Sequence, residues 1–214
     1  EAVRHVDWRA LRLWKTPAAP AAESDADAAT GAMPGFETGP EPKACFAQLA
    51  DPDAAVDAGG IAKGWIPDPL VAAMEAQGLS GTIVNLGGNV AVSGTKPTGD
   101  PWRVGIRDPR DPSQLIGAVP LVAGSAVTSG VYERCFTAPD GTFYHHILDP
   151  RTGRPVENDV AGVTVICEKS IDAEGFSTTL LALGLKRGLA LARRHPEILQ
   201  AFFIAPDGTI TNAR

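Results

Sequence analysis

Hydrophobic residues along the chain fall into short runs separated by glycine, proline and aspartate, and most of these runs have the length and period of strands. Strands are expected at 82–85, 90–93, 102–106, 160–167, 202–205 and 209–211, with further β structure over 119–148. Helices are expected at 172–183 and 185–194. Because the strands come in clusters and do not alternate strictly with helices, we expect an α+β fold in which a mainly antiparallel sheet packs with helices.

One further helix is predicted by its end signals. Asp68 is expected to be its N-cap, followed by Pro69 at the first helical position. Apolar residues then recur near helical spacing, and Gly78 is a stop signal. The segment between Asp68 and Gly78 is therefore expected to form a short amphipathic helix.

The first 43 residues are less regular. Apolar positions within 1–14 predict a strand pair or an amphipathic segment. Alanine, proline, glycine and acidic residues dominate 16–43. Such a composition does not bury enough apolar surface to offset the conformational entropy lost on folding. We expect a single domain over 1–214 that carries a flexible loop or insertion at 16–43.

Composition limits the classes of function. The chain has 214 residues and a net charge of −6, so nonspecific binding to nucleic acid is not expected, although a local site can still be positive. The sequence contains no apolar run of transmembrane length, and its first residues are not expected to form a signal peptide. The spacing of its three cysteines matches no zinc site.

A glycine-rich elbow that ends in a lysine is the first candidate for chemistry. Residues 57–64 read DAGGIAKG, and glycines of this kind leave backbone N–H groups free to cradle an anion. Lys63 adds a positive charge. The segment matches neither a Walker loop nor the dinucleotide-binding glycine pattern, and taken alone such a stretch is more often only a turn.

A carboxylate and a hydroxyl form the second candidate. Glu174 and Thr178 lie four residues apart, so they share one face of the helix expected there. Oxygen ligands of this kind suit Mg²⁺, which usually completes its shell with phosphate. The alternative is an ordinary solvated helix face, which is the better expectation for a lone glutamate.

Two histidines end a predicted hairpin, which has strands at 134–137 and 142–148 and a turn at Asp140-Gly141. Strand alternation places His145 and His146 on opposite faces, so one should face the core or a cleft and the other solvent. Histidine can accept a proton near neutral pH. A structural and a catalytic histidine are equally compatible with this pattern.

Six motifs in order resemble the bacterial FAD:protein FMN transferases, the ApbE-type flavin transferases, over about residues 55–184. They are 57–64 (DAGGIAKG), 85–89 (NLGGN), 101–106 (PWRVGI), 128–132 (TSGVY), 146–153 (HILDPRTG) and 173–178 (AEGFST). The resemblance implies a tunnelling-fold-like α+β domain. It also implies Mg²⁺-dependent transfer of FMN from FAD to a Ser or Thr hydroxyl of a target protein, with release of AMP.

The resemblance also implies roles for individual residues. His146 would take the proton from the attacking hydroxyl. Glu174 and Thr178 would ligate Mg²⁺ together with a backbone carbonyl of the elbow, that of Gly60. Lys63 would lie near the phosphates. The FAD pocket would include Asn85, Gly87, Gly88, Asn89, Ser129, Gly130 and Tyr132.

Two other functions stay open: a Mg²⁺-dependent FAD pyrophosphatase that yields FMN and AMP, and a non-catalytic flavin-binding protein. The family usually has aspartate at the position of Glu174, and the chain is expected to lack the family's usual N-terminal portion. Family analogy implies that the target is a subunit of a membrane redox complex or a domain of an extracytoplasmic reductase. By the same analogy, the protein is expected to be extracytoplasmic, membrane-anchored or periplasmic.

Overall fold

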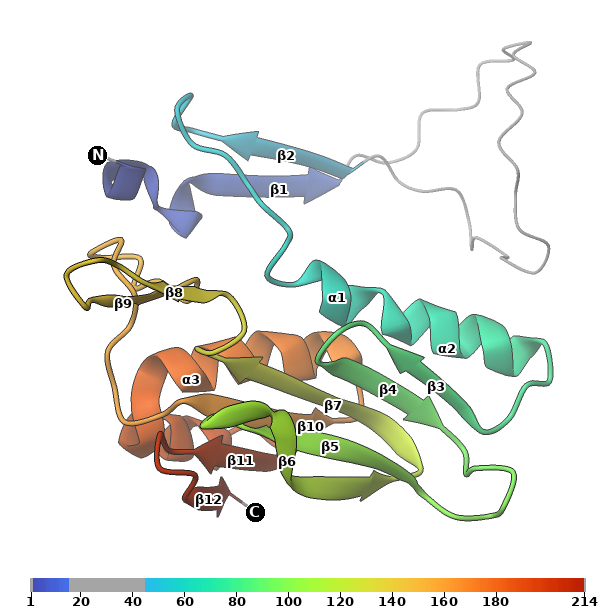
Figure 1. Ribbon diagram of the computed structural model, residues 1–214. Helices are drawn as coiled ribbons and strands as arrows, with labels where there is room; N and C mark the ends of the chain where they lie inside the picture. Colours follow the sequence, from blue (N-terminus) through green and yellow to red (C-terminus); the bar gives the residue numbers. More distant parts are fainter. Residues whose placement is uncertain (1, 16–44, 214) are drawn as a thin grey trace, which may run out of the picture. The chain divides into compact units, whose positions relative to one another are not determined.

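The structure is a computed structural model that describes residues 2–15 and 45–213 (Figure 1). The chain divides into two compact units, Glu1–Val56 and Asp57–Arg214, and each is considered by itself. The loop expected at 16–43 lies outside the described residues. The single domain expected over 1–214 stays a prediction.

A two-stranded sheet forms the first unit. Two short 3-10 helices, Ala2–His5 and Trp8–Ala10, precede β1 (Leu11–Lys15), which pairs antiparallel with β2 (Cys45–Leu49). The strand β1 overlaps the region 1–14, for which the pattern predicted a strand pair or an amphipathic segment. Its partner β2 was not predicted by the sequence pattern.

A six-stranded sheet is the frame of the second unit (Figure 1). Its strands are β3 (Thr82–Asn85), β4 (Asn89–Ser93), β7 (Ala123–Gly130), β10 (Gly162–Cys167), β11 (Ile198–Ile204) and β12 (Ile210–Ala213). They lie in the order β12-β11-β10-β7-β4-β3, and every neighbouring pair is antiparallel. The predicted α+β class with a mainly antiparallel sheet is confirmed.

The central strand β10 is buried on both of its faces. Val163 and Val165 contribute to a core cluster that includes Leu180 and Leu181 of the long helix α3 (Ser170–Ala192). Ile166 faces the opposite cluster with residues of the ribbon formed by β5 (Trp102–Asp108) and β6 (Asp111–Leu121). A layer on each side of the sheet explains why the sequence shows a continuous apolar run here rather than an alternating one.

The helix α3 is broken at one glycine. Gly184 has φ 74° and ψ 175°, which separates two helical halves at the position where the sequence predicted two helices. Asn158 and Asp159 hold the break from outside the helix. The Asn158 amide donates to the carbonyl of Leu181 (2.8 Å), and the Leu185 N–H donates to the Asp159 carboxylate (2.9 Å). These two contacts satisfy backbone groups that the break would otherwise leave unpaired.

The expected N-cap at Asp68 is wrong. The helix α2 (Pro67–Ala76) begins two residues earlier than predicted, since Pro67 fits the first turn of a helix, and its N-cap Ile66 makes no side-chain bond. The Asp68 carboxylate instead accepts the N–H groups of Ser170 (2.8 Å) and Ile171 (3.2 Å). Asp68 therefore caps the first turn of α3, a helix about a hundred residues further along the chain.

A close approach between α1 (Ala62–Trp65) and α3 depends on Gly64. A Cβ at this position would lie 2.5 Å from the Glu174 Cβ and 3.1 Å from the carbonyl oxygen of Ser170. A side chain of any size would therefore push apart the two helices that carry Lys63 and Glu174.

We expect Gly64→Ala to lower the free energy of unfolding by about 1–3 kcal/mol, because the added methyl group overpacks a contact with backbone atoms. Urea unfolding measures the effect. Gly117→Ala is the matched control, since a Cβ there has nothing within 4 Å. Equal stabilities of the two variants would show that α1 and α3 tolerate a wider separation.

The predicted hairpin is formed by β8 (Cys135–Thr137) and β9 (Phe143–His145), with the Asp140-Gly141 turn between them. The second strand is shorter than the predicted 142–148. It ends before Leu148, which forms an isolated bridge with Pro155. In the part of the chain that the structure describes, no helix combines the length and the apolarity needed to cross a membrane.

Candidate active site

One pocket of about 1040 Å³ in the second unit gathers most of the residues singled out from the sequence. Those that line it are Gly60, Lys63, Gly87, Ser129, Gly130, His146, Glu174 and Thr178. They come from five separate parts of the fold: the elbow with α1, the β3–β4 turn, the end of β7, the residue after β9, and α3. Segments spread over more than a hundred residues thus converge on a single cavity.

Glu174 is the buried acid of this pocket, with only 5% of its surface exposed. Its Oε2 accepts a hydrogen bond from the Asn89 side-chain amide (2.8 Å), and its Oε1 lies 3.6 Å from the Lys63 ammonium. Asn89 is itself completely buried and accepts a hydrogen bond from the Ser170 hydroxyl (2.8 Å). The carboxylate is therefore fixed from one side, and its second oxygen faces a cation.

A chain of hydroxyl groups lies beside Glu174. The Ser129 hydroxyl is 2.9 Å from both the Ser177 and the Thr178 hydroxyls, and the Ser177 hydroxyl donates to the carbonyl of Glu174 (3.1 Å). Each hydroxyl has a single proton, so Ser129 donates to Ser177 and Thr178 donates to Ser129. Thr178 therefore keeps oxygen lone pairs available toward the pocket.

The two adjacent histidines differ as alternation predicted. His145 is buried, and its ring nitrogens bond to the Val156 carbonyl (3.1 Å) and the Ile147 N–H (3.3 Å), which fixes the proton on Nε2. His146 lines the pocket. Partial burial lowers the pKa of His146 below its ordinary value of 6.5, with a smaller opposing contribution from a hydrogen bond to the Arg134 backbone. The imidazole of His146 is therefore neutral at pH 7 and able to accept a proton.

Four of the residues expected in the FAD pocket do not line this cavity: Asn85, Gly88, Asn89 and Tyr132. The Asn85 side chain accepts the Gly87 N–H (3.1 Å), and the Gly88 carbonyl accepts the Thr128 N–H (2.9 Å), so both shape the turn beside the cavity. Of the motif at 85–89, Gly87 therefore lines the cavity, and Asn85 and Gly88 hold the turn that carries it.

Tyr132 packs against Gly130, which lines the pocket. A Cβ on Gly130 would meet the Tyr132 ring at 2.6 Å, so the glycine is what allows the ring to pack there. Burial raises the pKa of Tyr132 to about 12. The ring therefore packs against the Gly130 backbone, and its expected place in the FAD pocket stays a prediction.

Several charged residues of the pocket lay outside the predicted set. They are Asp57, Glu133, Arg134, Asp149, Arg151 and Arg187. Asp57 and Asp149 belong to motifs already singled out, and Arg151 holds Asp149 at 2.7 Å and lowers the pKa of that carboxyl to about 2. Arg187 follows the break in α3, and no sequence signal separates it from an ordinary exposed helix residue. The cavity therefore combines carboxylates with guanidinium groups that can meet phosphate.

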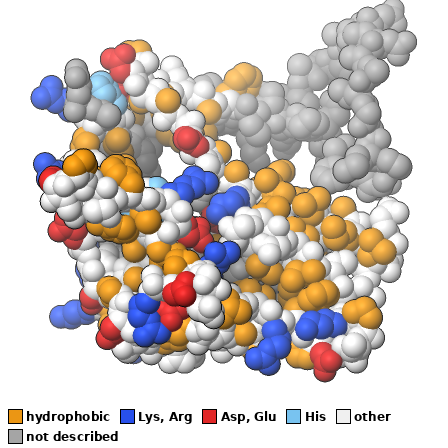
Figure 2. Space-filling model, in the orientation of Figure 1, with side chains coloured by type: hydrophobic (Ala, Val, Ile, Leu, Met, Phe, Trp, Pro, Cys, Tyr) orange, Lys and Arg blue, Asp and Glu red, His pale blue; other side chains and the backbone are white. Residues whose placement is uncertain are grey.

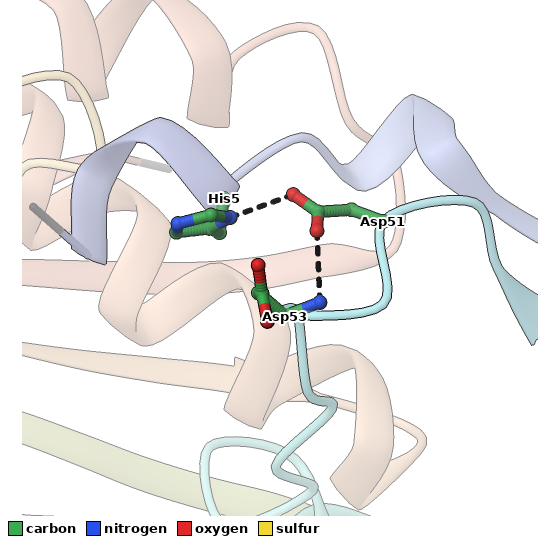
Figure 3. Close-up of side chains that lie close together, drawn as sticks. All are labelled: His5, Asp51 and Asp53. Atoms are coloured by element: carbon green, nitrogen blue, oxygen red, sulfur yellow. Dashed lines mark hydrogen bonds and ion pairs between the residues drawn. The ribbon is translucent and has the colours of Figure 1, made fainter.

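A second polar cluster lies in the first unit, where His5, Asp51 and Asp53 offer side-chain atoms within 4.8 Å of one another (Figure 3). The Asp51 carboxylate bonds to the His5 ring (2.7 Å) and to the Asp53 N–H (2.9 Å), and the His5 bond lowers the pKa of Asp51. Both oxygens of Asp51 are thus already used. The cluster ties the first 3-10 helix to the turn after β2.

Comparison with known proteins agrees with these features. The ApbE family model matches residues 2–203. The chain is 41% identical to the FAD:protein FMN transferase of Treponema pallidum over 170 residues, which cover 75% of this chain and 46% of the relative. It is 38% identical to the FAD:protein FMN transferase of Klebsiella pneumoniae over 167 residues, which cover 78% of this chain and 50% of the relative.

A solved structure gives the same result. The ApbE protein of Thermotoga maritima has a TM-score of 0.66 and 34% identity, and the match covers 74% of this chain and 51% of that protein. The chain spans about half the length of the curated relatives it matches. A family model that matches nearly the whole chain, a shared fold and the ordered motifs lead to one conclusion: the chain belongs to the ApbE family.

Proposed function

We propose that this chain transfers FMN from FAD to a Ser or Thr hydroxyl of a target protein and releases AMP. The observation that carries the proposal is the meeting of Lys63, Glu174 and His146 in one pocket. The relatives' name, FAD:protein FMN transferase, supplies the flavin donor and a protein acceptor. By family likeness, the target is a component of a membrane redox complex or an extracytoplasmic reductase, and the protein acts outside the cytoplasm.

The donor set at Glu174 fits Mg²⁺. Among the described residues, Glu174 Oε1 has only the Lys63 ammonium nearby, Thr178 keeps lone pairs, and Gly60, which lines the pocket, has a backbone carbonyl to offer. All are oxygen donors of the kind a hard cation prefers. We infer that Glu174, Thr178 and the Gly60 carbonyl hold the metal. Bound there, Mg²⁺ would neutralise charge that develops on the pyrophosphate oxygens.

The chain's own groups then account for the transfer step. The neutral imidazole of His146 accepts the proton of the acceptor hydroxyl as its oxygen attacks the phosphorus of the FMN half. A P–O ester bond forms between the acceptor oxygen and the FMN phosphorus, and the bond from that phosphorus to the bridging pyrophosphate oxygen breaks. The bridging oxygen stays on the adenosine phosphate, which leaves as AMP. Lys63 and the arginines of the pocket stabilise the negative charge of the phosphates.

A single incubation separates this function from its alternatives. The protein is mixed with FAD, Mg²⁺ and a peptide that carries an acceptor Thr, and the products are measured by chromatography and mass spectrometry. An FMN adduct on the peptide with equal AMP supports transfer. AMP and free FMN without an adduct support an FAD pyrophosphatase, and intact bound FAD supports a flavin-binding protein.

Asn89 is expected to set the metal affinity of the site, because its amide holds the buried Glu174 carboxylate. Asn89→Leu removes this donor in a similar volume, and we expect about 10- to 100-fold weaker metal binding, as for other residues that orient a metal ligand. Titration with Mn²⁺, followed by electron paramagnetic resonance in the absence of FAD, measures it.

The matched control for Asn89 is Ser125→Ala. It removes another buried hydrogen bond of the same sheet, from the Ser125 hydroxyl to the Val90 carbonyl (3.0 Å), without touching Glu174. Both variants should lose some stability, but only Asn89→Leu should lose metal affinity. Equal affinities in the two would mean that Glu174 needs no support from Asn89.

A further inference from the structure

The hairpin β8–β9 presents a pair of aromatic rings to solvent. Phe136 and Tyr144 are directly opposite each other across the two strands, and their rings stack at 5.2 Å with an interplanar angle of 13°. Phe136 is 64% exposed and Tyr144 is 38% exposed. Figure 2 shows hydrophobic side chains gathered where Figure 1 places this hairpin. Stacked rings left open to water on a short hairpin suit a binding surface better than a structural core.

The aromatic pair lies on a hairpin that leads into the active-site pocket. Arg134 directly precedes β8 and His146 directly follows β9, and both line the pocket. Phe136 and Tyr144 each lie two residues further into the hairpin. The aromatic pair is therefore close along the chain to the proposed catalytic base.

His145 anchors the hairpin to the protein. It is buried and bonds to the Val156 carbonyl, and its ring lies 6.0 Å from that of Phe143, which is itself 47% exposed. Neither Phe136 nor Tyr144 belongs to either core cluster of the described residues.

Both strands also keep an unpaired edge, since β8 and β9 form a two-stranded sheet with each other among the described strands. An extended peptide can add to such an edge or lie across such a face. The acceptor hydroxyl belongs to a polypeptide, so the residues on either side of it must also lie against this protein when the hydroxyl reaches His146. His146 directly follows β9, so the hairpin is close to those residues.

We propose that Phe136 and Tyr144 form the docking surface for the segment of the target protein that flanks the acceptor hydroxyl. This proposal rests on the proposed function of FMN transfer. Positions two residues apart in an extended segment are separated by about 7 Å, and Tyr144 is two residues from His146 along the chain. The aromatic pair therefore receives an apolar side chain two residues before or after the acceptor Ser or Thr.

The test uses peptides of eleven residues with a central Thr and Leu, Ala, Ser or Asp at one of the positions two residues away. The protein is supplied with FAD and Mg²⁺, and FMN adducts are quantified by mass spectrometry. We expect wild-type protein to favour the Leu peptides over the Asp peptides by about tenfold, the order expected for burying one apolar side chain. The double variant F136S/Y144S should lose this preference and about tenfold in kcat/KM, with kcat at saturating peptide unchanged.

Three controls keep the test specific. Ile210→Ser removes an apolar side chain of similar exposure (40%) on β12, an edge strand of the main sheet, and should change nothing. The swap F136Y/Y144F keeps both rings and should keep the Leu preference. FAD affinity and the slow release of AMP without peptide should match the wild type within twofold, which shows that the hairpin variant has kept its active site.

Each outcome decides a separate point. An unchanged Leu preference in F136S/Y144S contradicts the docking surface while leaving FMN transfer intact. A loss of FAD affinity in that variant assigns the two rings to the nucleotide site and also contradicts the proposal. Wild-type protein that binds FAD but forms no adduct with any peptide overturns the proposed function itself, and the docking surface with it.

Discussion

Replacing His146 with alanine is expected to slow FMN transfer by about 100- to 10,000-fold, the range in which general bases contribute to enzymatic rates. The His146 side chain lines the pocket, and partial burial lowers its pKa. FAD binding should persist, because the proposed contacts with the pyrophosphate come from other residues. Single-turnover reactions followed by mass spectrometry measure the effect on the chemical step.

The pH dependence gives a second readout of the same variant. A base acts in its neutral form, so activity should be lost as the pH falls through the pKa of His146. Because that pKa lies below 6.5, the acidic limb of the wild-type rate profile should also lie below 6.5. We expect this limb to disappear from the residual activity of His146→Ala.

The matched control is His195→Gln, which changes a partly exposed histidine outside the pocket. It should keep both the wild-type rate and the acidic limb. Transfer at the wild-type rate by His146→Ala would assign the proton to another acceptor and contradict the mechanism.

Replacing Glu174 with glutamine is expected to weaken metal binding and to slow transfer by about 100-fold or more, since it removes the only buried negative charge among the proposed ligands. Glutamine keeps the size of the side chain and an oxygen that can accept the Asn89 bond. The change thus isolates the charge. Mn²⁺ titration and the dependence of the rate on Mg²⁺ concentration measure the two effects.

Asp172→Asn is the control for Glu174, because it neutralises an acid two residues earlier in the same helix that does not line the pocket. It should leave the Mg²⁺ requirement unchanged. A Glu174→Gln protein with the wild-type Mg²⁺ requirement would show that the metal is held elsewhere.

The sequence predicted those parts of the fold that depend on local patterns. The buried run of 160–167 became the central strand β10, because its residues alternate between two apolar layers. The separation of the last long helical region into two at residue 184 was predicted from the same local signals, and the positive φ of Gly184 provides it. Alternation also predicted that His145 and His146 face opposite sides, and the structure shows that His145 is the buried one and that His146 lines the cavity.

These local patterns could not predict contacts between residues that are far apart in the chain. Asp68 looked like the N-cap of its own helix, but its partners are N–H groups about a hundred residues away. Asn89 follows a glycine turn and begins β4, and nothing local indicates that it holds a carboxylate 85 positions later. The pocket arginine Arg187 resembles any exposed helix residue until α3 has packed on the sheet. Such roles come from tertiary packing, which local propensity does not encode.

The mass of an acceptor peptide after incubation with the protein, FAD and Mg²⁺ tests the central claim most directly. The account predicts a peptide whose Thr carries FMN through a phosphoester, an equal amount of AMP, and the loss of both products when Mg²⁺ is chelated. An unmodified peptide together with intact FAD, under conditions in which the protein binds FAD, would contradict it.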